Sequence, residues 1–104
     1  MPLRLRRLSR WLRRHYPLRH KATVRVLPPA SLPGLHGEME FTETKPARIR
    51  IRIAHSSDEV MMETLVEEYA HAIRHECGVP VQNEHDHLFW AIYGHITMHY
   101  RGGE

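Results

Sequence analysis

A carboxylate and an imidazole lie four positions apart in the C-terminal half of the chain, at Glu67 and His71. On a helix such a pair shares one face, so both side chains can reach one metal ion. Zinc accepts carboxylate oxygen and imidazole nitrogen as ligands. A second carboxylate, Glu68, directly follows the first and could act as a general base towards a metal-bound water. The spacing therefore predicts a metal-binding helix with a base beside the ion.

The same segment, residues 67–71 (EEYAH), is the zinc-peptidase motif H-E-x-x-H with glutamate in the first ligand position. Catalytic zinc usually has three protein ligands, so one more must come from outside the helix. His85 follows across a loop that contains Gly78 and Pro80, and an antiparallel return of the chain would bring it close to the pair. His87 competes for the same role.

Three interpretations of Glu67 stay open. It could ligate zinc in a working hydrolase, although an anionic ligand should raise the pKa of the metal-bound water. It could instead mark a degenerate site that binds metal weakly or not at all. Alternatively, His71 and His75, which are also four positions apart, could bind a structural metal with Ala72 where the base belongs. Glu68 also has an alternative, because adjacent glutamates on a helix are often simply solvated.

Alternation of apolar and polar residues predicts three strands, at residues 22–27, 38–42 and 48–54. The third strand (RIRIRIA) is the clearest, because isoleucine and arginine alternate along it and point to opposite faces. Since this strand leads directly into the motif helix, we expect it to be the exposed sheet edge along which an extended peptide would pair.

Three helices complete the pattern. Residues 3–16 predict a basic amphipathic helix that ends at Pro17, and residues of about 85–100 predict the last helix. Between them, Ser56 and Glu59 have the spacing of a capping box and should start the motif helix. The expected core-facing residues are Met62, Val66, Tyr69 and Ile73 on the motif helix, and Leu88, Phe89, Ile92, Tyr93 and Ile96 on the last one.

The predicted fold class is α+β, with an N-terminal helix, a small, mostly antiparallel three-stranded sheet, the motif helix and a C-terminal helix. At 104 residues the chain is expected to hold one domain, residues 22–104, preceded by a basic arm, residues 1–21.

Two further segments carry a family pattern. The motif helix reads TLVEEYAHA over residues 64–72, and the last helix is preceded by His85-Asp86 and carries Phe89 four residues after that histidine. Over about residues 47–101 the chain resembles the SprT-like family of small zincin metallopeptidases. The resemblance implies a zinc site made by Glu67, His71 and His85, with Glu68 as the base that activates the zinc-bound water.

The resemblance implies zinc-dependent hydrolysis of a peptide or protein substrate. The alternative is a catalytically inactive family member that acts as a metal-binding or nucleic-acid-associated module. Tyr93 could support an oxyanion near such a site, but a tyrosine packed in the core is the simpler interpretation.

Positive charge is concentrated at the N-terminus. Residues 1–21 contain eight Lys/Arg and no acid, whereas residues 22–104 contain seven Lys/Arg and twelve Asp/Glu. This arm could contact nucleic acid or resemble an organelle transit peptide. We favour a third interpretation, a helix that packs through Leu5, Leu8 and Leu12 and leaves its arginines in solvent.

Composition excludes several classes of protein. The single cysteine, Cys77, excludes an internal disulfide framework and favours a reducing, cytoplasmic environment. No apolar run approaches the roughly 18–20 residues of a membrane span, and no signal peptide is expected. Ten histidines, six of them in the last third of the chain, are consistent with metal binding.

Overall fold

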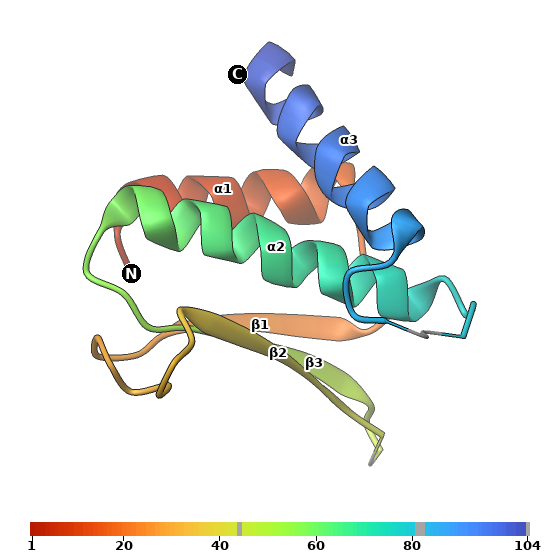
Figure 1. Ribbon diagram of the computed structural model, residues 1–104, viewed down its shortest axis with the longest axis horizontal. Helices are drawn as coiled ribbons and strands as arrows, with labels where there is room; N and C mark the ends of the chain where they lie inside the picture. Colours follow the sequence, from red (N-terminus) through yellow and green to blue (C-terminus); the bar gives the residue numbers. More distant parts are fainter. Residues whose placement is uncertain (44, 81–82, 104) are drawn as a thin grey trace.

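The computed structural model describes residues 1–43, 45–80 and 83–103. It has an α+β architecture of two layers, in which helices cover one face of a three-stranded sheet (Figure 1). The elements follow in the order α1 (Leu3–His15), β1 (Lys21–Val26), β2 (Gly37–Thr42), β3 (Arg48–Ile53), α2 (Asp58–Glu76) and α3 (His87–Gly103). Residues 81–82 of the predicted loop before α3 lie outside the described residues.

The sheet has the strand order β1-β3-β2, so β3 is the central strand. It pairs in parallel with β1 and antiparallel with β2, and the sheet is therefore mixed. The prediction that residues 48–54 form an exposed edge is wrong. The strand's apolar face is fully buried, and each side of its backbone is taken by a neighbouring strand.

The two faces of the sheet differ as the alternation in β3 predicts. Ile49, Ile51 and Ile53 are buried beneath the helices, beside apolar residues of β1 and β2 that share their register. On the opposite face Arg50 and Arg52 of β3 lie opposite acidic residues of β2, and Arg50 pairs with Glu40. These pairs explain how a strand with alternating arginines can occupy the centre of the sheet.

Helix α1 packs against α2 through Leu5, Leu8 and Leu12, which are buried in the common core. Its arginines point to solvent: Arg4, Arg6, Arg7, Arg10, Arg13 and Arg14 are all exposed. The packed interpretation of the N-terminal helix is therefore confirmed. Residues 1–21 share one hydrophobic core with the rest of the chain.

Helix α2 begins one residue later than the predicted capping box. Ser57, and not Ser56, is the N-cap, and its hydroxyl accepts a hydrogen bond from the backbone N–H of Val60. Tyr69 and Val66 are buried as predicted, while Met62 and Ile73 pack against the core from its margin. The helix ends at Glu76, two residues before Gly78, whose φ of 73° suits glycine.

Helix α3 crosses the C-terminal half of α2 and extends past the end of α1 (Figure 1). Phe89 and Ile96 are fully buried, with Ile92 and Tyr93 packed beside them. Leu88 was expected in the same stripe, but it is 37% exposed because it lies on the outer side of the first turn. No helix among the described residues is both long enough and apolar enough to cross a bilayer.

Candidate metal site

Three side chains converge where α2 passes the start of α3. The ligand atoms of Glu67, His71 and His85 all lie within 4.8 Å of one another. Glu67 and His71 share one face of α2, and His85 comes from the loop that precedes α3. Within the described parts of the chain, this is the one such group of three His, Cys, Asp or Glu residues.

The spacing of these donors fits one metal ion. His85 Nε2 lies 3.4 Å from Glu67 Oε1. Two ligands of a tetrahedral ion are separated by about this distance when each bond is about 2.0–2.1 Å long. Two imidazoles and one carboxylate also form a known donor set of catalytic zinc, with a fourth position left for water. The residues present therefore fit zinc.

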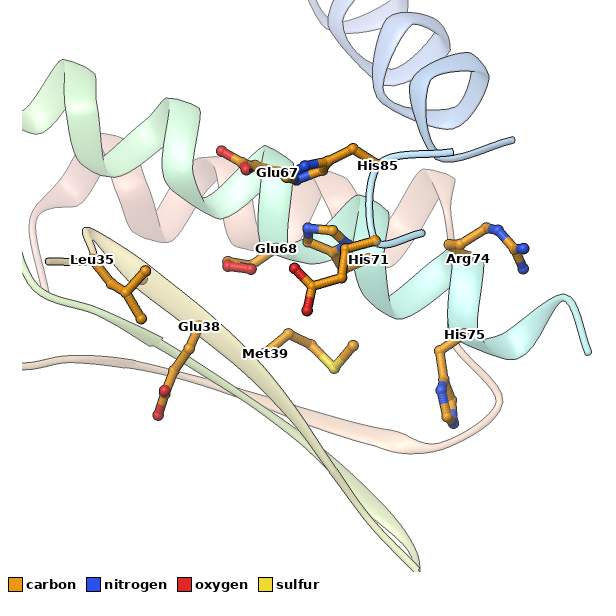
Figure 2. Close-up of a pocket in the computed structure, with 11 residues that line it drawn as sticks. Leu35, Glu38, Met39, Glu67, Glu68, His71, Arg74, His75 and His85 are labelled. Carbon is orange, nitrogen blue, oxygen red and sulfur yellow. Dashed lines mark ion pairs between the residues drawn. The ribbon is translucent and has the colours of Figure 1, made fainter. Parts of the chain in front are cut away.

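The three donors border a groove between α2 and β2 (Figure 2). The groove has a volume of about 400 Å³. β2, an edge strand of the sheet, forms its lower wall, and Leu35 and Met39 contribute apolar surface there. A chain placed in this groove would therefore meet both the donors and the free edge of β2.

Glu68 also lines the groove, but it is only 8% exposed. Burial raises the pKa of this carboxyl to about 7, and the nearby charges of Glu67, Glu38 and Glu84 add to the shift. The interpretation of Glu68 as a solvated surface residue is therefore wrong. It is a buried carboxyl whose pKa lies well above the ordinary value of a glutamate.

Gly37 allows β2 to approach α2 closely enough to cover Glu68. A Cβ at this position would lie 2.5 Å from Thr64 Cγ2 and 3.0 Å from the backbone oxygen of Arg52. It would also lie 3.6 Å from Glu68 Cγ. Because the Arg52 oxygen belongs to the neighbouring strand, it cannot simply rotate away. Glycine is therefore required for the narrow end of the groove.

His71 is half-buried and stacks on Phe89, with ring centroids 4.3 Å apart. Burial lowers the pKa of His71, and the adjacent His85 lowers it further, while Glu67 and Glu84 oppose the shift. A lowered pKa favours the neutral imidazole, which is the form that ligates a metal.

Arg74 holds the loop that carries His85. It is 3% exposed, and its guanidinium donates to both carboxylate oxygens of Asp86 at 2.7–3.1 Å. It also donates to the backbone oxygens of Val79 and Pro80. Asp86 in turn accepts from the backbone N–H of Phe89 and caps α3. One buried cation thus fixes both the loop and the start of the helix.

The sequence argument missed Arg74 and Asp86. The signal for Asp86 was present, because an aspartate three residues before the first buried residue of a helix is a typical N-cap. Because Asp86 is the N-cap, α3 begins at His87 and not at the predicted residue 85. A buried arginine inside an amphipathic helix has no comparable sequence signal, since Arg is usually exposed.

The competing candidates are not part of the donor group. His75 extends towards β2, where its ring contacts Phe41 at a centroid distance of 4.3 Å (Figure 2). His87 is exposed at the start of α3 and is not part of the donor group. Tyr93 packs against Phe89 beside the core and does not line the groove.

Comparisons with protein-family models, with curated proteins and with solved structures found no match for this chain. The argument about function therefore depends on the geometry of the described residues.

Proposed function

We propose that this chain is a small zinc-dependent peptidase of the SprT-like type, with Glu67, His71 and His85 as zinc ligands. The observation that supports the proposal is the convergence of these three donors beside a buried carboxyl in one groove. Glutamate in the first motif position is then a ligand that contributes oxygen in place of nitrogen.

The chain's own residues supply the acid–base chemistry. Zinc, when bound, would polarise a peptide carbonyl and lower the pKa of a coordinated water. Glu68 would accept a proton from that water on a carboxylate oxygen and deliver it to the leaving amine. A general base is most effective when its pKa lies near the working pH, and in the metal-free chain burial raises the pKa of Glu68 to about 7, towards that range.

The proposed substrate is an extended segment of a polypeptide. β2 is an edge strand, so the backbone N–H and C=O groups on its outer side have no strand partner within the sheet. An added strand could pair with them and pass directly beneath the donors. This replaces the sequence-based choice of β3, whose two sides are both occupied. We propose the cytoplasm as the compartment, because the free thiol of Cys77 suits reducing conditions.

The test is cleavage of an unfolded protein by the purified chain, with and without a chelator. The proposal expects cleavage that the chelator abolishes, that added zinc restores, and that Glu68→Gln lowers by at least 100-fold, the lower end of what general-base catalysis contributes. Glu63→Gln is the matched control, because Glu63 is exposed on α2 and does not line the groove. Equal cleavage by Glu68→Gln and the wild-type chain would contradict the proposal.

A second candidate function is nucleic-acid binding through α1. Its arginines lie on the solvent side, and none of them forms an ion pair within the described ranges. Like charges one turn apart on a helix repel each other. A bound polyanion would neutralise this repulsion between the arginines of α1. Because the leucines of α1 are part of the core, deletion of residues 1–21 would unfold the chain.

Substitution of surface charge is therefore the better test of this candidate. Arg6→Gln/Arg10→Gln/Arg14→Gln should abolish binding of a DNA duplex while the thermal midpoint stays close to that of the wild-type chain. Wild-type binding should weaken with added salt, because phosphate contacts release counterions. Binding that survives the triple substitution would rule out α1 as the contact surface.

A further inference from the structure

A second group of imidazoles lies where α3 passes the end of α1. The hydroxyl oxygen of Tyr16 is 2.7 Å from His95 Nδ1 and 2.9 Å from His99 Nδ1. Tyr16 directly follows α1, while the two histidines lie four positions apart on α3 and share one helix face. Three donor atoms from two helices thus meet at one point, far along α3 from the groove.

The two hydrogen bonds of the Tyr16 hydroxyl run in opposite directions. A tyrosine hydroxyl carries one hydrogen, so it can donate to only one of the two Nδ1 atoms. The other ring must then donate its own Nδ1 hydrogen to the hydroxyl oxygen. Both Nδ1 atoms therefore lie 2.7–2.9 Å from one phenol oxygen, a separation that neighbouring ligand atoms of a single ion can also have.

The surrounding contacts fix this group in place. The backbone oxygen of Tyr16 accepts a hydrogen bond of 2.6 Å from the hydroxyl of Tyr69, which is fully buried. Trp11 packs edge-on against the ring of His99, with centroids 4.9 Å apart. His15 lies beside His99 at a centroid distance of 5.0 Å. A preorganised donor set binds an ion with less ordering than a mobile one.

We propose that Tyr16, His95 and His99 form a second site for a divalent transition-metal ion, independent of Glu67, His71 and His85. The separations of 2.7 Å and 2.9 Å between the Tyr16 oxygen and the two Nδ1 atoms correspond to oxygen–metal–nitrogen angles of about 90°, if each bond to the metal is about 2.0 Å long. Near-right angles and nitrogen–oxygen donors favour tetragonal ions of the Cu²⁺ and Ni²⁺ class over tetrahedral zinc. On binding, the phenol hydrogen is released to solvent and the phenolate oxygen becomes a ligand.

The site would join α1 to the far half of α3. Figure 1 shows that this half extends away from the sheet and past the end of α1. The bound ion would therefore stabilise the position of α3, whose other end carries the loop of the first site. Any ion that binds only the folded chain raises its stability.

The test uses the full chain with Glu67→Ala/His85→Ala, which removes two exposed donors of the first site and leaves the second untouched. Titration with Cu²⁺ alone, followed by calorimetry and visible absorption, should show one equivalent bound with a phenolate-to-copper charge-transfer band. Tyr16→Phe, which removes only the hydroxyl, should abolish the band. His99→Ala should weaken binding by at least about 10-fold. His87→Ala, an exposed histidine at the other end of α3, is the matched control and should change neither.

Two results would overturn the proposal. One is the absence of saturable binding in the Glu67→Ala/His85→Ala chain. The other is a chain with Tyr16→Phe or His99→Ala that binds Cu²⁺ as tightly as its parent and keeps the band. In either case the group is a hydrogen-bonded contact between helices only. Because the first donor set is already removed, neither result depends on the proposed peptidase activity.

Discussion

Two carboxyl groups beside the groove differ in how their charge is compensated. Asp86, at the start of α3, is paired with the buried guanidinium of Arg74, which lowers the pKa of Asp86 to about 2. Glu68, on α2, has no cationic partner within the described residues, and burial raises its pKa to about 7. The first group is held as an anion, whereas the second is held close to its neutral form.

The difference separates a carboxylate that stabilises the fold from a carboxyl to which we assign the proposed proton transfer. A carboxylate that is paired with a buried cation and caps a helix stabilises the fold, so Asp86 needs no proton-transfer role to explain it. An unpaired buried carboxyl lowers the stability of the folded chain at neutral pH. Such groups are typical of sites where proton transfer is needed, since perturbed pKa values are concentrated there. Glu68 is therefore explained better by chemistry than by folding.

The largest expected effect comes from breaking the compensated region. Asp86→Ala leaves the guanidinium of Arg74 buried without its anion and removes the cap of α3. We expect this to be the most destabilising substitution discussed, and to weaken zinc binding by about 10–100-fold because His85 loses its support. Urea unfolding and zinc titration would measure the two effects.

Asp58→Ala is the matched control, since Asp58 is an exposed aspartate in the first turn of α2. It should change stability little. The ion pair should also give acid sensitivity, because its contribution is present above about pH 4 and is lost as pH falls towards about 2. An Asp86→Ala chain as stable as the control, or one that keeps the acid transition, would contradict the assigned role.

The next effect has the opposite sign and concerns the uncompensated region. Glu68→Gln should stabilise the metal-free chain above about pH 7 by roughly 3–4 kcal/mol. The folded pKa of about 7 exceeds the unfolded value of about 4.3, so the folded state holds more protons between them and stability falls as pH rises. Glutamine cannot lose a proton and avoids this fall.

Urea unfolding at about pH 5 and about pH 8, in chelator, is the measurement. The stability of the two chains should be similar at the lower pH and should diverge at the higher one. A stability curve for Glu68→Gln that parallels that of the wild-type chain would show that Glu68 is not buried as described.

A smaller effect should follow from opening the narrow end of the groove. Gly37→Ala places a Cβ against Thr64 and the backbone oxygen of Arg52, which should cost about 1–3 kcal/mol. Gly94→Ala is a matched control, because a Cβ in that position of α3 meets nothing within 4 Å. Alanine suits a helix better than glycine, so this control should be stabilised by about 0.5–1 kcal/mol. Thermal unfolding would measure both effects. If Gly37→Ala and Gly94→Ala shifted the midpoint of unfolding in the same direction, the close approach of β2 to α2 would be contradicted.

The smallest effect is expected at His75. His75→Ala removes an exposed ring that contacts Phe41 and should leave zinc affinity within about 2-fold of the wild-type value. Zinc titration tests this directly. Loss of zinc binding in this variant would favour the alternative pair of His71 and His75. It would show that the ligands assigned to the site are wrong.

The sequence predicted the fold class and most elements to within two residues, because periodic patterns in α1, β3 and α2 are strong. It failed on strand order, since pairing depends on which neighbours flank β3 and not on the pattern of β3 itself. The same limit explains why the edge was assigned to β3 and not to β2.

The donor set was predicted from spacing and resemblance, but the residues that hold the donors and the groove in place were not. Arg74 acts through the loop that follows α2 and through a capping residue 12 positions further along the chain, and no sequence pattern shows that it turns back to them. Gly37 acts through a contact between β2 and α2. Tyr16, His95 and His99 were assigned no role, because residues 79 and 83 positions apart give no sign that they meet.

The most direct test of the account is the zinc stoichiometry of the first site. Calorimetry on the chain with Tyr16→Phe/His99→Ala, which removes the second site, should show one zinc bound per chain. Adding His85→Ala or Glu67→Ala should remove that binding, whereas adding His87→Ala should leave it unchanged. Zinc binding that persists without both His85 and Glu67 would contradict the account.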